Sequence, residues 1–227
     1  MKLLAVDTAT MTRSVALLEN GQVISEKTCV AQETHSKQLH ETIGDVLAMA
    51  GTSLESVDAL AVTTGPGSFT GLRIGVSAVK GLAFALNKPV AAVSTLEALS
   101  YPFRFSSMAI CPVIDARRGE VYTATYRYLD DALTLIGLER LTVPEDIGND
   151  MDGPVIFTGS GASAYRDIIG RRLGSLAHFA PPPLTLIRGS IVGFLGYERL
   201  QKRGGDPVES LAPLYIRKSD AELNFRK

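Results

Sequence analysis

The sequence predicts an α/β fold built from two half-domains of related topology, the second reduced. Hydrophobic residues make up 45% of the 227-residue chain and charged residues 21%, as in globular proteins that bury a core. Short apolar runs typical of strands alternate with patterns of helical period. The order of these elements in the first half recurs in the second half, which indicates two units of one kind.

The first half begins with three strands in a meander. We expect them at residues 2–6, 14–18 and 23–29, with Asn20-Gly21 as a hairpin turn. A helix from Ser36 to Ala50 follows, because its apolar residues recur at helical spacing, and Gly51 ends it. A strand at 58–62, a helix at 72–86 and a strand at 90–93 complete this half.

The second half repeats this order in shorter form. We expect strands at 109–114, 120–128, 133–141 and 155–157, and helices at 162–169 and 190–201. Three meandering strands, then helix, strand, helix and strand, is the order of a ribonuclease-H-like half-domain. Such halves are paired in the actin and sugar-kinase superfamily. We expect half-domains at 1–103 and 104–227, the last helix being able to pack back on the first.

The helix expected at 72–86 is apolar on nearly all sides. At about 100° per residue, Arg73, Ser77 and Lys80 fall in one narrow arc. An ordinary surface helix buries about a third of its circumference, so this helix needs a second apolar neighbour besides its own sheet. The neighbour is either another part of this chain or another subunit.

The loop before this helix contains Gly65, Gly67 and Gly71, and helix N-termini attract phosphate. A Walker loop would place a glycine where Thr70 stands and Lys-Ser/Thr after it, and neither is present. The dinucleotide fingerprint fits loosely, but no acidic residue ends the next strand. An NAD-binding oxidoreductase is a further alternative, and the three-stranded meander argues against that fold.

Three separated segments resemble the TsaB (YeaZ) family. They are TGPGSFTGLRIG at 64–75, IDARRGEVY at 114–122 and PLYIR at 213–217. The resemblance implies a non-catalytic subunit that acts with the transferase TsaD and a small ATPase, TsaE. TsaD transfers threonylcarbamoyl to N6 of the adenosine next to the anticodon, in tRNAs reading codons that begin with adenine. Family members also form homodimers when alone, and they meet tRNA through the complex.

The resemblance also bears on metal binding. TsaD has two metal-binding histidines four residues apart, after a strand like the one at 90–93, and the matching positions here are Thr95 and Leu99. Leucine cannot bind a metal, and one threonine hydroxyl is a poor ligand. His35 and His40 are five apart, which is the wrong spacing for a helical metal pair. We therefore expect no metal site and no cofactor.

Four residues are candidates for nucleotide binding. Asp7 and Asp115 follow the first strand of each half, where superfamily members hold magnesium, and Gly159 and Gly161 stand where they pack an adenosine. The alternative function is therefore a nucleotide-dependent phosphotransferase of the actin-like superfamily. The simpler interpretation of Asp7 is a turn or N-cap carboxylate. No nucleophile elbow or catalytic triad is found, so we expect no catalytic residue and no protease activity.

Charge and composition limit the partners and the compartment. The net charge of −1 does not suit a protein that binds RNA without a partner. Cys29 and Cys111 form no metal or redox motif, and free thiols fit a reducing compartment. The chain starts directly with a strand, and no apolar run reaches the ~20 residues of a membrane span. We therefore expect a cytoplasmic protein with no membrane contact.

The two striped helices are the predicted contact with TsaD or with a second copy. The expected contact residues are Leu39, Ile43, Val46, Leu47, Leu72, Gly75, Val76, Val79, Leu82 and Leu86. An interface of this kind is strongly hydrophobic. A charge at Val79 or Leu82 would then prevent the association.

Overall fold

The computed structural model describes residues 1–30, 36–149 and 151–217. Its contacts divide the chain into two compact units. One unit contains residues 1–98 and 187–213, and the other contains 99–186 with the described residues from 214 on. These bounds differ from the expected half-domains because helix α6 (Gly189–Arg203) lies on the sheet of the first unit.

The first unit contains a five-stranded sheet in the order β3-β2-β1-β4-β5. The strands are β1 (Lys2–Asp7), β2 (Thr12–Glu19), β3 (Gln22–Val30), β4 (Ala59–Gly65) and β5 (Val90–Ser94). The first three form the predicted antiparallel meander, and β4 and β5 run parallel to β1. Asn20 and Gly21 both have positive φ, 51° and 80°, as the predicted hairpin turn requires.

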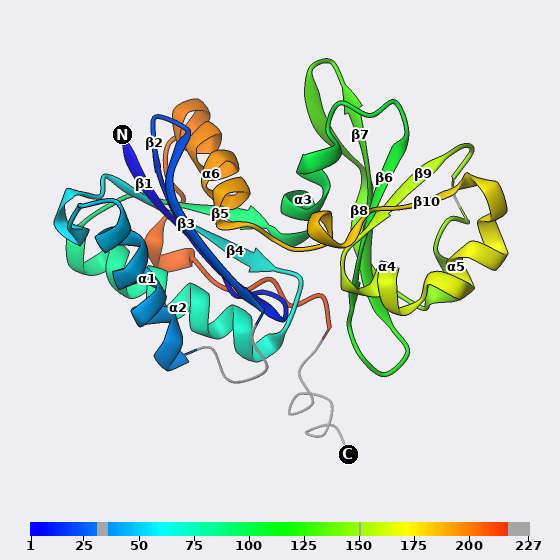
Figure 1. Ribbon diagram of the computed structural model, residues 1–227, viewed down its shortest axis with the longest axis horizontal. Helices are drawn as coiled ribbons and strands as arrows, with labels where there is room; N and C mark the ends of the chain where they lie inside the picture. The colour runs from blue at the N-terminus through cyan, green and yellow to red at the C-terminus, as the bar shows by residue number, and fades with distance from the viewer. Residues whose placement is uncertain (31–35, 150, 218–227) are drawn as a thin grey trace. The chain divides into compact units, whose positions relative to one another are not determined.

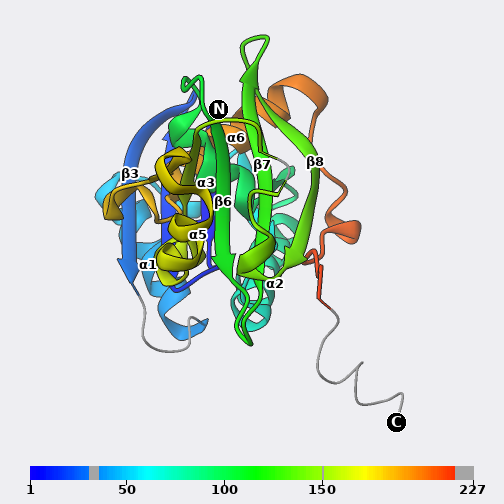
Figure 2. The ribbon, with the colours of Figure 1, turned by 90° about the vertical axis from the view of Figure 1, so that its right-hand side faces the viewer.

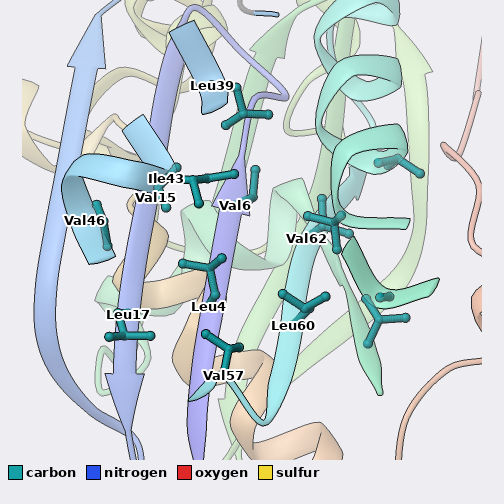
Figure 3. Close-up of a cluster of buried hydrophobic side chains, with 14 of the residues drawn as sticks. Leu4, Val6, Val15, Leu17, Leu39, Ile43, Val46, Val57, Leu60 and Val62 are labelled. Carbon is teal, nitrogen blue, oxygen red and sulfur yellow. The ribbon is translucent and has the colours of Figure 1, made fainter. Parts of the chain in front are cut away.

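Helices cover both faces of this sheet (Figure 1). Helices α1 (Ser36–Met49) and α2 (Phe69–Leu86) lie on one face and α6 on the other. Figure 3 shows the core beneath α1, where Leu39 and Ile43 face Val6 and its neighbours on β1, β2 and β4. Helix α2 begins at Phe69, earlier than the expected Leu72, because Ser68 caps it by accepting a hydrogen bond from the Gly71 N–H (3.3 Å).

Helix α6 lies close to the sheet because it presents glycine to it. A Cβ at Gly196 would be 2.6 Å from the Cβ of Ala61, so no larger residue fits there without movement. The start of α6 is anchored by Glu26, whose Oε1 accepts hydrogen bonds from Ser190 N and Oγ, both at 3.0 Å. A carboxylate there suits the positive end of the helix dipole.

The second unit contains a sheet with the same plan, in the order β10-β9-β6-β7-β8. Its strands are β6 (Ala109–Asp115), β7 (Val121–Leu129), β8 (Ala132–Thr142), β9 (Val155–Thr158) and β10 (Ala177–Phe179). Strands β6, β7 and β8 form the meander, side by side in Figure 2, and β9 and β10 run parallel to β6. The repeat confirms the prediction of two related halves.

The reduction of the second half lies in its helices. Where the first unit has α1, the second has only a 3-10 turn, Pro144–Asp146. The helix expected at 162–169 is divided at Tyr165 into α4 (Ser160–Ala164) and α5 (Arg166–Leu173). Strand β10 and the short helix α3 (Thr95–Ser100) were not predicted, because both are too short for a periodic pattern.

Among the described helices, only α2 has the length and hydropathy of a membrane span, with a mean hydropathy of 1.3. This is a weak indication, because core helices of globular proteins pass the same test. Leu72, Val76 and Val79 of α2 are buried in the first unit.

Candidate functional site

The end of β1 is the most unusual polar position of the first unit. Asp7 is fully buried (0% exposed). Its Oδ1 accepts hydrogen bonds from Thr63 Oγ1 (2.7 Å) and from the Ala9 N–H (3.1 Å). In the described part of the chain its Oδ2 has no hydrogen-bond partner. A buried carboxylate with one unpartnered oxygen is costly when ionised.

This environment changes the acidity of Asp7. Burial raises the pKa of its carboxyl group to about 7, although the hydrogen bonds from Thr63 and Ala9 act in the opposite direction. The group therefore changes charge near neutral pH. Such a pKa also occurs at catalytic sites, so access to the carboxylate decides between a structural and a chemical role.

Access is limited because the glycine-rich loop packs directly on the residues after Asp7. A Cβ at Gly67 would lie 2.3 Å from Ala9 O, one at Gly71 2.1 Å from Thr8 O, and one at Gly75 2.3 Å from Thr8 Oγ1. Real Cβ atoms do not approach so closely, so only glycine fits at these three positions.

Hydrogen bonds fix this contact. Ser68 N–H donates to Ala9 O (2.7 Å), and Thr8 Oγ1 donates to Gly71 O (2.7 Å). The glycines of the loop thus admit protein backbone at the place where a phosphate-binding loop admits phosphate. Gly67, Gly71 and Gly75 serve packing between β1 and α2, a role that the spacing alone did not reveal.

Asp115 is the counterpart of Asp7 in the second unit, and it is exposed. Its Oδ1 accepts hydrogen bonds from the Arg117 N–H (2.8 Å) and from Tyr165 Oη (3.4 Å). Its own N–H donates to Ser160 Oγ (3.2 Å). The carboxylate therefore organises the β6–β7 turn, as an aspartate at the start of a turn commonly does.

Gly159 and Gly161 repeat the packing role of the loop glycines. A Cβ at Gly159, where φ is 95°, would be 2.5 Å from Val113 O, and one at Gly161 would be 3.0 Å from Asp115 N. These two glycines let α4 approach the end of β6. Adenosine binding at them stays a prediction.

The β6–β7 turn has an unusual backbone that the end of the chain supports. Arg117 and Arg118 both have positive φ, 61° and 57°, a conformation uncommon outside glycine. Arg217 donates to Ala116 O (2.7 Å) and forms an ion pair with Glu120. The PLYIR segment, whose role the sequence did not indicate, thus ends in an arginine that holds this turn.

The positions matched to metal ligands carry no ligand set. Thr95 and Leu99 are both buried. No group of three or more His, Cys, Asp or Glu side chains with metal-site geometry occurs among the described residues. His40 is exposed on α1, and His35 lies outside the described residues.

Most residues named for the interface are buried within the first unit, because the apolar stripes of α1 and α2 face their own sheet. The buried ones are Leu39, Ile43, Val46, Leu47, Leu72, Gly75, Val76 and Val79, while Leu82 and Leu86 are half-buried. The buried side chains cannot reach a partner in the folded unit. The apolar side chains that can do so are Phe84 (72% exposed), Met49 (61%) and Phe69 (37%).

Comparisons with known proteins agree on one family. The family model for TsaD, tRNA N6-adenosine threonylcarbamoyltransferase, matches residues 23–225. The chain is 34% identical over 228 residues to the tRNA threonylcarbamoyladenosine biosynthesis protein TsaB of Bacillus subtilis, covering 99% of this chain and 98% of the relative.

Solved structures agree with this result. YeaZ from Pseudomonas aeruginosa is similar with a TM-score of 0.83 and 33% identity, over 94% of this chain and 99% of that one. The ROK hexokinase from Thermus thermophilus shares the fold at 10% identity, with a TM-score of 0.52 over 88% of this chain and 99% of that one. The predicted actin and sugar-kinase-like fold is therefore confirmed.

We predict that Gly71→Ala destabilises the protein by about 1–3 kcal/mol, because its Cβ must displace the Thr8 backbone. Gly81→Ala is the matched control on the same helix, since nothing lies within 4 Å of its Cβ. It should stabilise the protein by up to about 1 kcal/mol through helix propensity. Urea unfolding measures both, and equal stabilities would contradict the packing role.

We also predict that Asp7→Asn changes how stability depends on pH. Between about pH 4 and pH 7 the folded protein holds a proton on Asp7 that the unfolded chain has lost. The stability that protonated Asp7 contributes is thus present below about pH 4 and is lost as pH rises through about 7.

The free energy of unfolding of the asparagine variant, relative to wild type, should therefore rise by roughly 1.4 kcal/mol per pH unit across this range. It should be level above about pH 8. Urea unfolding at pH 5, 6, 7 and 8 measures the difference, and parallel curves would show that Asp7 does not titrate as described.

Proposed function

The chain belongs to the TsaB (YeaZ) family, and from this premise we propose that it is the non-catalytic subunit for threonylcarbamoyl transfer to tRNA. The acceptor is N6 of the adenosine next to the anticodon, in tRNAs reading codons that begin with adenine. The single observation that carries this function is the 34% sequence identity to a TsaB protein, which extends over 99% of this chain.

The assignment to a non-catalytic role is supported by the polar positions of the first unit. The residues that stand where the transferase has metal-binding histidines are Thr95 and Leu99, which are buried. Asp7 is buried as well, and the loop beside it is filled by backbone. The reacting groups are thus supplied by a TsaD-type partner.

The same observations weigh against the alternative, a nucleotide-dependent phosphotransferase. A carboxylate that holds a magnesium-bound phosphate must be open to it, and a backbone carbonyl would repel the phosphate. Here the carbonyls of Thr8 and Ala9 face Gly71 and Gly67. ATP turnover that is lost in Asp7→Ala would favour the alternative.

The proposed partners are a TsaD-type transferase, a TsaE-type ATPase and, through the complex, tRNA. A second copy of the chain takes the place of the transferase when the protein is alone. The proposed contact is the outer face of α1 and α2, where Phe84, Phe69 and Met49 are exposed. Exposed aromatic residues and methionine are enriched in the cores of protein interfaces.

Because the substrate is tRNA, the proposed location is the cytoplasm.

The experiment that tests the function is to deplete the protein in its host and measure threonylcarbamoyladenosine in bulk tRNA by mass spectrometry. The nucleoside should fall as the protein disappears and return when the gene is supplied again. An unchanged level after full depletion would refute the proposed function.

We predict that Phe84→Glu prevents co-purification with the transferase, because a charge would be buried in an apolar contact. Val23→Glu is the matched control, since Val23 is also exposed but lies on β3. Val79→Glu should instead unfold the protein, because Val79 is buried in the core. A folded Phe84→Glu variant, judged by thermal unfolding, that still co-purifies would contradict this interface.

A further inference from the structure

A stack of aromatic rings and one arginine lies on the second unit, formed by residues 101–105 and by Tyr128 of β7. The Arg104 guanidinium carbon is 4.3 Å from the ring centroid of Tyr101 and 4.3 Å from that of Phe105. Phe105 also meets Tyr128 of β7 edge to face, with centroids 5.3 Å apart and planes at 75°. We call these four residues the Arg104 stack.

Two features distinguish the Arg104 stack from an ordinary patch of core. Phe105 is 72% exposed although it is a large apolar side chain. In the part of the chain that the structure describes, no carboxylate forms an ion pair with Arg104. One exposed phenylalanine alone is common. An exposed ring beside a stacked cation with no anionic partner is a combination suited to a ligand.

The chemistry of the Arg104 stack fits an unpaired nucleotide. Bases of single-stranded RNA stack on aromatic rings and on guanidinium planes. A guanidinium stacked on rings keeps its N–H edge free to bind phosphate oxygens. A carboxylate of a protein partner would account for Arg104 alone. It would leave the exposed ring of Phe105 without a contact.

We propose that the Arg104 stack binds an unpaired nucleotide of the substrate tRNA, its base on Phe105 and its phosphate at Arg104. This inference rests on the proposed function, and it names a contact between this subunit and the RNA. A single stacking contact is also consistent with the net charge of −1, which is too low for binding along a long RNA backbone.

The turn that follows Tyr128 and Leu129 carries two acidic residues. Asp130 and Asp131 form the β7–β8 turn, directly after Tyr128 and Leu129. Their carboxylates repel phosphate on that side. In the proposed arrangement the phosphate lies at Arg104, the positive group of the stack, and the base covers the exposed ring of Phe105.

The test uses the complex reconstituted from this chain, the transferase and the ATPase, with an unmodified transcript of a tRNA that reads a codon beginning with adenine. Phe105→Ala should raise KM for this tRNA roughly 5- to 100-fold, the effect of losing one stacked base, with kcat unchanged. Phe105→Trp keeps a ring and should retain the wild-type KM. Leu138→Ala, another highly exposed side chain of the second unit, is the matched control and should also leave KM unchanged.

Arg104→Lys separates stacking from charge. Lysine keeps the positive charge but loses the planar group, so KM should rise less than in Phe105→Ala. The dependence of KM on salt should stay that of wild type in Arg104→Lys.

An equal KM in Phe105→Ala and Leu138→Ala would overturn the proposal, and so would loss of co-purification with the transferase in Phe105→Ala.

The outcomes separate this inference from the proposed function. If the complex with wild-type protein forms no threonylcarbamoyladenosine, the proposed function fails. If wild-type protein supports the reaction and Phe105→Ala matches it in KM, only the Arg104 stack fails as an RNA contact. A photoreactive phenylalanine analogue at position 105 should cross-link to the tRNA, and cross-linking to a protein subunit alone would overturn the proposal.

Discussion

The close contact between the end of β1 and the start of α2 is the constraint on which the first unit depends. The carbonyl groups of Ala9 and Thr8 fill the space above Gly67 and Gly71, and the Thr8 hydroxyl fills the space above Gly75, so a Cβ at any of these positions would collide. Two hydrogen bonds of 2.7 Å, from Ser68 N–H and Thr8 Oγ1, close the contact. It holds α2 on the sheet and encloses Asp7. Phe84 of α2 stays exposed on the side away from this contact.

The second unit has the same kind of close glycine contact between a helix and a strand end, with two glycines in place of three. Gly159 and Gly161 bring α4 against the end of β6, as the loop glycines bring α2 against β1. The two sheets have one strand order, so corresponding elements meet at corresponding strand ends. In both halves, the glycines that suggest a nucleotide site admit backbone of the same chain. A fold shared with sugar kinases thus does not by itself imply their chemistry.

Much of the fold could be predicted because the apolar residues recur with the periods of strands and helices. The meander and the Asn20-Gly21 turn depend on local signals alone. The interface residues could not be predicted in the same way. An apolar stripe such as Leu39 to Leu47 does not reveal whether it faces its own sheet or another subunit. The division of 162–169 at Tyr165 and the contact of Arg217 with the β6–β7 turn depend on tertiary packing. Tyr101, Arg104 and Phe105 are neighbours in sequence, but their contact with Tyr128 of β7 depends on the tertiary fold.

Because the glycine-rich loop packs against protein backbone, we expect it to hold no phosphate. Calorimetric titration of the purified chain with ATP and magnesium measures this most directly. We expect no binding tighter than the millimolar range, for wild type and for Asp7→Ala alike. Micromolar binding that is lost in Asp7→Ala would contradict it, because it would show a nucleotide at the place that the backbone of Thr8 and Ala9 occupies.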